Sequence, residues 1–252
     1  MSYSRHFARM RCASLISISF ILILTSYTAN AGDGTNTLDL VLRDWITQNI
    51  KFVADKENRE TIFVRQRPIR AYIKSDDVAV NLDAKNAVAN FADAFGLEHS
   101  FAMSDINMII ATASDISDHG RPKKSILIGL GFPESAANKI AEESDWSSGC
   151  GTYDSRNIDG RLSVSIVVGD TSLPPKKLRS CIVTGIIFGF GMRVKGQDIL
   201  DYSNDYMQFL LLARSIAHCE KTIGSQNSGQ SKPKPDDYIE CVFDSLRSKL
   251  TE

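Results

Sequence analysis

Apolar residues recur every three or four positions in several stretches of the chain, a spacing that lines one face of a helix. The clearest stretch covers residues 82–95 and is followed by Gly96, a residue type that commonly ends a helix. Its shared apolar face consists of Ala84, Val88, Phe91 and Phe95. The same spacing predicts four further helices, over residues 38–54, 133–143, 174–190 and 206–218.

A second pattern, in which apolar and polar residues alternate, predicts β-strands. Its clearest case is a hairpin formed by residues 152–158 and 161–168. Asp159-Gly160, which lies close to the middle of this segment, is a strong hairpin-turn dipeptide. Two more strands are expected, over residues 67–73 and 107–113.

Residues 124–130 are ambiguous, because their apolar pattern fits a strand as well as a helix. Across the whole chain, strands and helices mix without a regular βαβ rhythm. This order favours an α+β fold, a single domain in which a twisted mixed sheet is packed with helices.

The N-terminus carries a third pattern. Three arginines lie within the first eleven residues, an apolar run follows over residues 13–24, and a small-x-small tripeptide ends at Ala31. These are the parts of a secretory signal peptide. The run is shorter than the ~20 apolar residues that span a bilayer, which disfavours a retained anchor. We predict a signal peptide over residues 1–31, cleavage before Gly32, and a mature domain over residues 32–252.

The mature chain is expected to be mildly acidic. The whole sequence has 29 basic and 30 acidic residues, and the leader holds three of the basic ones and none of the acidic ones. Its removal leaves 26 basic against 30 acidic residues, a net charge of about −4. This balance gives no support for binding to nucleic acid. Because no second long apolar run occurs, we expect no stable membrane insertion after cleavage and a periplasmic or secreted protein.

Four cysteines remain after cleavage: Cys150, Cys181, Cys219 and Cys241. An even number in an exported chain predicts two disulfides. Three pairings are possible, and the sequential one, Cys150–Cys181 and Cys219–Cys241, closes the shortest loops. The absence of CxxC spacing disfavours a zinc site. The second bond would tie a C-terminal helix, residues 236–252, across a flexible polar loop, residues 223–235.

The mature sequence shows no familiar catalytic or metal-binding motif. Its histidines, His99, His119 and His218, are far apart, and neither HExxH nor HxH occurs. No serine lies in a GxSxG elbow. We therefore assign no catalytic, cofactor-binding or metal-binding residue.

Two charged clusters have both a functional and a structural interpretation. The acidic residues within 142–145 lie beside Trp146 and would suit glycoside hydrolysis, but a solvated helix end is commoner. The arginines within residues 65–70 would suit an anion, but a strand edge protected by charge is commoner.

Three short features belong together. One is the segment FVRQRPIR over residues 63–70, and another is Cys150 followed by a hairpin and Cys181. The third is the helical segment RSCIVTGIIFGFGM over residues 179–192, with a second apolar helix after it. Together they resemble an exported bacterial family, domain of unknown function family 2927, over roughly residues 60–218.

Members of that family look like degenerate relatives of zincin-type metallopeptidases, so the resemblance implies a zincin-like scaffold and a Cys150–Cys181 bond. The family's helix typically reads Cys-x-x-Glu-Glu-x-x-Gln-x-x-Gly-Leu. Here Thr184, Gly185 and Phe188 stand at the two glutamate positions and the glutamine position. None of them supplies a zinc ligand or a carboxylate base, so the scaffold is expected without the metal motif.

The leading hypothesis is an exported, non-catalytic envelope or periplasmic module that binds an unknown envelope protein or small ligand. The alternative is a hydrolase of envelope peptide or glycan, with its site outside the helix over residues 179–192. A cleft with convergent acids, histidines or a serine–histidine pair would favour the hydrolase. An apolar or basic cleft without them would favour binding.

Overall fold

The computed structural model describes residues 34–54, 60–62, 67–101, 103–156, 162–193, 205–226 and 234–250. The predicted signal peptide, its cleavage point between Ala31 and Gly32, and the Asp159-Gly160 turn lie outside these ranges.

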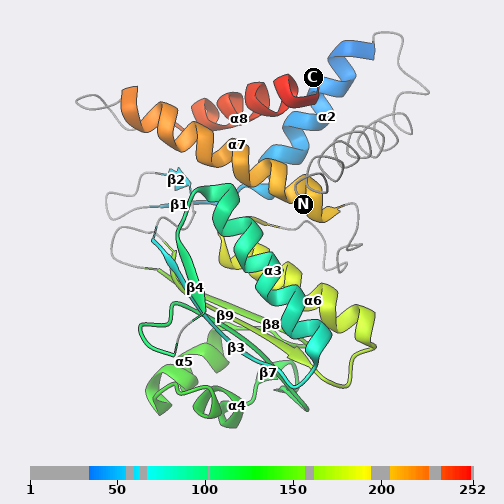
Figure 1. Ribbon diagram of the computed structural model, residues 1–252, viewed down its shortest axis with the longest axis vertical. Helices are drawn as coiled ribbons and strands as arrows, with labels where there is room; N and C mark the ends of the chain where they lie inside the picture. Colours follow the sequence, from blue (N-terminus) through cyan, green and yellow to red (C-terminus); the bar gives the residue numbers. More distant parts are fainter. Residues whose placement is uncertain are drawn as a thin grey trace, which may run out of the picture.

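A five-stranded mixed sheet forms the centre of the fold (Figure 1). Its strands lie in the order β4 (His99–Phe101), β3 (Ile69–Lys74), β5 (Met108–Ala113), β9 (Leu162–Asp170) and β8 (Cys150–Arg156). The first four run parallel to one another, and β8 pairs antiparallel with β9 as the predicted hairpin. With helices packed against this sheet in one compact domain, the predicted α+β class is confirmed.

Two helices, α3 (Val78–Phe95) and α6 (Pro175–Gly189), cover one face of the sheet (Figure 1). Asp77 caps α3 by accepting hydrogen bonds from the amides of its first turn, and Gly96 ends it with a φ of 67°. The apolar stripes of both helices pack on the alternate, inward residues of the strands. A large hydrophobic core, which includes Phe91 and Phe190, results from this packing.

A smaller unit covers the opposite face of the sheet. It consists of the hairpin β6 (Ser117–Asp118) and β7 (Arg121–Pro122), followed by α4 (Lys124–Gly129) and α5 (Glu134–Glu143). Its own core contains Trp146 together with Ile166 and Val168 of β9, whereas Val167 faces the larger core. The alternation along β9 thus supplies apolar residues to both faces.

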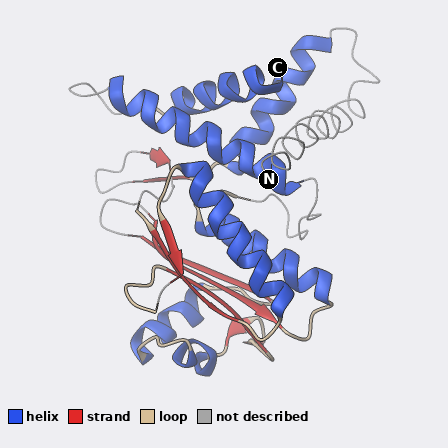
Figure 2. Cartoon of the chain, in the orientation of Figure 1, coloured by secondary structure: helices blue, strands red, loops and turns tan. Residues whose placement is uncertain are grey.

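A layer of three helices, α2 (Gly34–Asn49), α7 (Asp205–Gln226) and α8 (Pro235–Leu250), lies at one end of the molecule (Figures 1 and 2). A small two-stranded sheet, β1 (Phe52–Ala54) and β2 (Glu60–Ile62), lies beside it. Within the described ranges, no helix combines the length and the apolar character needed to cross a membrane.

Several boundaries differ from the sequence prediction. The helix expected over residues 38–54 ends at Asn49, because Ile50 pairs with Met192 and the chain then enters β1. The ambiguous segment over residues 124–130 is helical, because it contains α4 and ends at Leu130, the residue that caps this helix. Of the residues expected in a loop over 223–235, residues 223–226 belong to α7, and Pro235 begins α8, where proline suits a first helical position. Residues 227–233 lie outside the described ranges.

Candidate functional site

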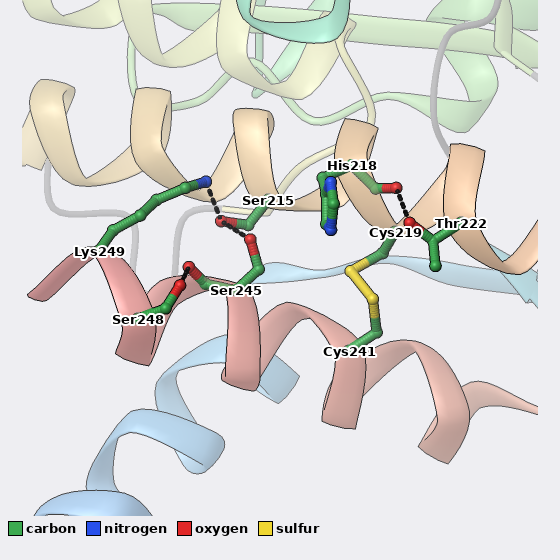
Figure 3. The surroundings of a disulfide bond; sticks show 8 residues. All are labelled: Ser215, His218, Cys219, Thr222, Cys241, Ser245, Ser248 and Lys249. Atoms are coloured by element: carbon green, nitrogen blue, oxygen red, sulfur yellow. Dashed lines mark hydrogen bonds between the residues drawn. A yellow bond between two sulfur atoms is a disulfide. The ribbon is translucent and has the colours of Figure 1, made fainter.

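The two disulfides have the sequential pairing and link separate elements. Cys150–Cys181 joins the edge strand β8 to α6, with the Cα atoms 5.7 Å apart. Cys219–Cys241 joins α7 to α8, with the Cα atoms 5.8 Å apart (Figure 3). Both distances lie within the range that disulfide geometry allows. The cysteines therefore fasten packed elements together and are not available as thiolate ligands or nucleophiles.

A polar cluster lies on the same two helices as the second disulfide (Figure 3). Lys249 Nζ and Ser245 Oγ both donate to Ser215 Oγ, over 3.1 Å and 3.2 Å. A serine–lysine pair can act as nucleophile and base in hydrolases, but Ser215 is fully buried. The cluster therefore satisfies a buried hydroxyl between α7 and α8.

The face of α6 that the zincin resemblance singles out is a packing surface. A Cβ atom added to Gly185 would overlap Val167 of β9 and lie 3.2 Å from Thr152 Cγ2. A Cβ atom added to Gly189 would lie 2.9 Å from the end of Met108. Both glycines thus allow the helix to approach the sheet closely, and the position of the expected general base has no room for a side chain.

The three histidines at positions 99, 119 and 218 lie on separate elements. His99 on β4 packs edge-on against Phe101, and His119 lies in the β6–β7 turn with 96% of its side chain exposed. His218 belongs to α7, where its carbonyl accepts a hydrogen bond from Thr222. In the part of the chain that the structure describes, no three histidine, cysteine or acidic side chains come together as a metal site.

The acids beside Trp146 do not form a sugar-binding pair. Glu142 and Glu143 are exposed at the end of α5, while Trp146 is fully buried and offers no ring for stacking. The Asp145 carboxylate accepts a hydrogen bond from the amide of Ser147 over 2.9 Å, and this contact lowers the pKa of Asp145. Asp145 therefore shapes a local turn.

The arginine cluster takes a different form from the expected strand edge. Arg65 lies outside the described residues, and Arg67 is exposed just before β3. Arg70 is on β3 and forms an ion pair with Asp105 over 2.6 Å. Because β4 and β5 flank β3, the interpretation of Arg70 as part of a charged sheet edge is wrong.

A pocket of about 660 Å³ opens on the smaller unit, and we call it the hairpin pocket. Such a volume is typical of small-molecule sites. It is lined by the β6–β7 hairpin, the start of α4 and the end of α5. The lining residues are Asp118, His119, Arg121, Pro122, Lys123, Lys124, Ser125, Ala141 and Glu142.

The backbone conformation of a two-residue turn determines the shape of the β6–β7 hairpin, which forms one wall of the hairpin pocket. His119 and Gly120 form a two-residue turn with φ values of 47° and 81°. Positive φ at both central residues suits the right-handed twist of a hairpin. The Gly120 carbonyl accepts a hydrogen bond from the amide of the buried Trp146 over 2.7 Å, so the turn is anchored to the core.

The hairpin pocket contains more basic than acidic side chains. Arg121, Lys123 and Lys124 oppose the carboxylates of Asp118 and Glu142. Lys123 forms an ion pair with Asp115, which lies outside the lining. Within the described residues, Arg121 and Lys124 form no ion pair, so two basic side chains of the lining have no fixed counter-charge.

The same lining contains a serine, a histidine and an aspartate without the geometry of a catalytic triad. His119 Nε2 lies 3.7 Å from Asp118 Oδ1, beyond hydrogen-bond distance. No hydrogen bond between described residues joins Ser125 to His119. Among the described residues, the three side chains therefore share a lining but do not form a hydrogen-bonded series.

Sequence reasoning missed the hairpin pocket and the Ser215 cluster. A signal for the pocket was present, since a His-Gly turn and three basic residues occupy positions 119–124. A signal for the cluster was the spacing of four residues between Ser215 and Cys219 on α7, which recurs between Cys241 and Ser245 on α8. Both signals are short and become informative only when the packing of the elements is known.

No family model matches the chain, and no curated protein or solved structure matches it either. The resemblance to domain of unknown function family 2927 thus rests on its short motifs.

Proposed function

We propose that the chain is an exported, non-catalytic binding module of the periplasm or cell envelope, and that its ligand surface is the hairpin pocket. The observation that carries the proposal is the lining of this pocket. Arg121 and Lys124, which form no ion pair with any residue that the structure describes, line a concavity of small-molecule size.

Two features support the exported part of the proposal. Two disulfides fasten the fold, and such bonds persist mainly in oxidising compartments. The N-terminal pattern is that of a cleavable leader. We expect N-terminal sequencing of the exported protein to begin at Gly32; a membrane-bound form that still starts at Met1 would contradict export by cleavage.

The fold also supports a zincin-like scaffold of the family 2927 type as part of this proposal. The Cys150–Cys181 bond that the resemblance implies is present, and it joins the β8–β9 hairpin to α6. The packed Gly185 argues against a hydrolytic centre on α6, because a catalytic glutamate there would overlap Val167.

Retention of envelope material on the immobilised mature protein tests the proposed function. We expect the wild-type protein to retain a component that elutes chemically unchanged, and the double variant Arg121→Glu/Lys124→Glu to lose it. Lys85→Glu is the matched control, since Lys85 is exposed on α3 and lies outside the pocket lining. Equal retention by the pocket variant and the wild-type protein would overturn the assignment.

A hydrolase is the second candidate, favoured by one observation: His119, Asp118 and Ser125 share the lining of the hairpin pocket. Ligand binding could bring these side chains into hydrogen-bond contact. This candidate predicts that the retained envelope component is cleaved, and that Ser125→Ala or His119→Ala stops cleavage while retention continues.

A further inference from the structure

We infer that the hairpin pocket binds an oxyanion, a carboxylate or a phosphate group, between Arg121 and Lys124. This inference rests on the proposed function, because it names the chemistry of the ligand for the same pocket. It follows from the pairing of charges around the pocket, from the balance of its lining and from the rigidity of its wall.

The three basic side chains of the lining differ in their partners. Lys123 is held by Asp115, and its amide donates to the Ile116 carbonyl over 2.9 Å. Arg121 and Lys124 are exposed, line the same concavity and have no ion-pair partner among the described residues. A guanidinium group offers a planar pair of donors that matches a carboxylate or a phosphate.

The acidic side chains of the lining limit the kind of anion that fits. The Asp118 carboxylate lies 3.7 Å from the His119 ring, and Glu142 faces the pocket from α5. Because Asp115 already neutralises Lys123, the charges of Arg121 and Lys124 are balanced by these two carboxylates. An anion is therefore held by direct contacts with Arg121 and Lys124, which suits a single oxyanion and disfavours a polyanion such as nucleic acid, whose binding needs many basic contacts.

The wall that carries Arg121 is ordered by its own contacts. The neighbouring Gly120 carbonyl is bonded to the amide of the buried Trp146, and a Cβ atom on Gly120 would lie only 3.2 Å from Ser147 Cβ. The turn is therefore closely packed against the chain after α5. A ligand that binds here does not have to order the hairpin, which reduces the entropic cost of binding.

Amide chemical-shift titration of the mature protein tests the inference, with inorganic phosphate and N-acetyl-alanyl-alanine as probes. The C-terminal amide of the same dipeptide is the neutral control, and ionic strength is held constant. We expect saturable shifts at residues 118–125 and 141–142 with at least one anionic probe and none with the neutral amide. Binding of one probe alone identifies the source of the oxyanion as phosphate or carboxylate.

Variants separate a specific site from general electrostatics. Loss of a charge-assisted hydrogen bond predicts that Arg121→Gln and Lys124→Gln each weaken binding roughly tenfold or more, whereas Lys85→Gln leaves it unchanged. Equal thermal unfolding midpoints establish that the variants are folded, and Lys124→Gln is the second variant if Arg121→Gln does not fold.

Two results would overturn the inference: neither anionic probe shifts the pocket amides, or both glutamine variants bind like the wild-type protein. If envelope material still shifts the pocket amides in that case, the inference of an oxyanion ligand is rejected while the proposed function stands. If neither the probes nor envelope material reach the pocket, both fail.

Discussion

Gly185 occupies a place on α6 where the sheet leaves no room for a side chain. A Cβ atom there would overlap Val167 Cγ1 and lie 3.1 Å from Val167 Cγ2, and Val167 is itself fully buried. Gly185, which stands at a glutamate position of the family's helix, therefore has a structural role. It lets α6 pack directly on β9.

Gly185→Ala tests that role. Overpacking costs about 1–3 kcal/mol, and the higher helix propensity of alanine returns at most about 1 kcal/mol. We expect the free energy of unfolding, measured by urea denaturation, to fall by about 1–2 kcal/mol.

The matched control for that variant is Gly129→Ala at the end of α4, where a Cβ atom meets nothing within 4 Å. It should leave stability unchanged or slightly raised. If Gly185→Ala behaves like Gly129→Ala, close packing of α6 is not the reason for the glycine.

Asp170 at the end of β9 provides a pH-dependent contribution to stability. Burial opposes ionisation of its carboxylate, but the amides of Ser172 and Ile116 donate to it over 2.8 Å and 3.2 Å. Together with further hydrogen bonds, they hold the pKa of Asp170 below its usual value. The folded state therefore binds this proton less readily than the unfolded state, so the stabilisation is present above the unfolded pKa of about 4 and is lost as the pH falls through the folded pKa.

Asp170→Asn removes this titration. We expect the variant to be less stable than the wild-type protein at pH 7 and to lose less stability than the wild-type protein between pH 5 and pH 3. Urea denaturation at several pH values measures both effects. Asp244→Asn, on the exposed face of α8, is the control for the substitution itself and should leave the stability at pH 7 unchanged; an identical acid loss in Asp170→Asn and wild type would contradict the account.

At the scale of elements, the predictable parts are those whose pattern is local. The helix before Gly96 and the antiparallel pairing of β8 with β9 follow from short-range periodicity. The end of α2 at Asn49 does not, because it depends on pairing between Ile50 and the distant Met192. The hairpin pocket also could not be predicted, since separate elements form its walls.

The second disulfide contributes to stability by fastening α8 to α7. Its cysteines are 22 residues apart in sequence, and for a loop of that size the chain-entropy account gives about 3–4 kcal/mol. We expect the double variant Cys219→Ser/Cys241→Ser to lower the free energy of unfolding by that amount in guanidinium denaturation.

Peptide mapping without reductant is the control for that variant, and should recover Cys219 linked to Cys241 in the wild-type protein. A loss of stability below about 1 kcal/mol would show that the bond adds little to the helix packing already present.

At the scale of the molecule, charge and shape separate the candidate surfaces. The sequence is acidic by one charge overall, and in the hairpin pocket Arg121 and Lys124 lie in the same lining as the carboxylates of Asp118 and Glu142. On α6, Gly185 and Gly189 pack closely against the sheet, at or next to the positions where a zincin would carry its metal ligands and base. Only the fold brings Arg121 and Lys124 to the same concavity as Glu142.

The most direct test of the central claim is an amide chemical-shift map of the mature protein during titration with envelope extract. Ligand binding at the hairpin pocket predicts saturable shifts concentrated at residues 118–125 and 141–142, with the α6 amides of residues 184–189 unchanged. Shifts concentrated on α6, with the hairpin pocket unaffected at saturation, would contradict the account.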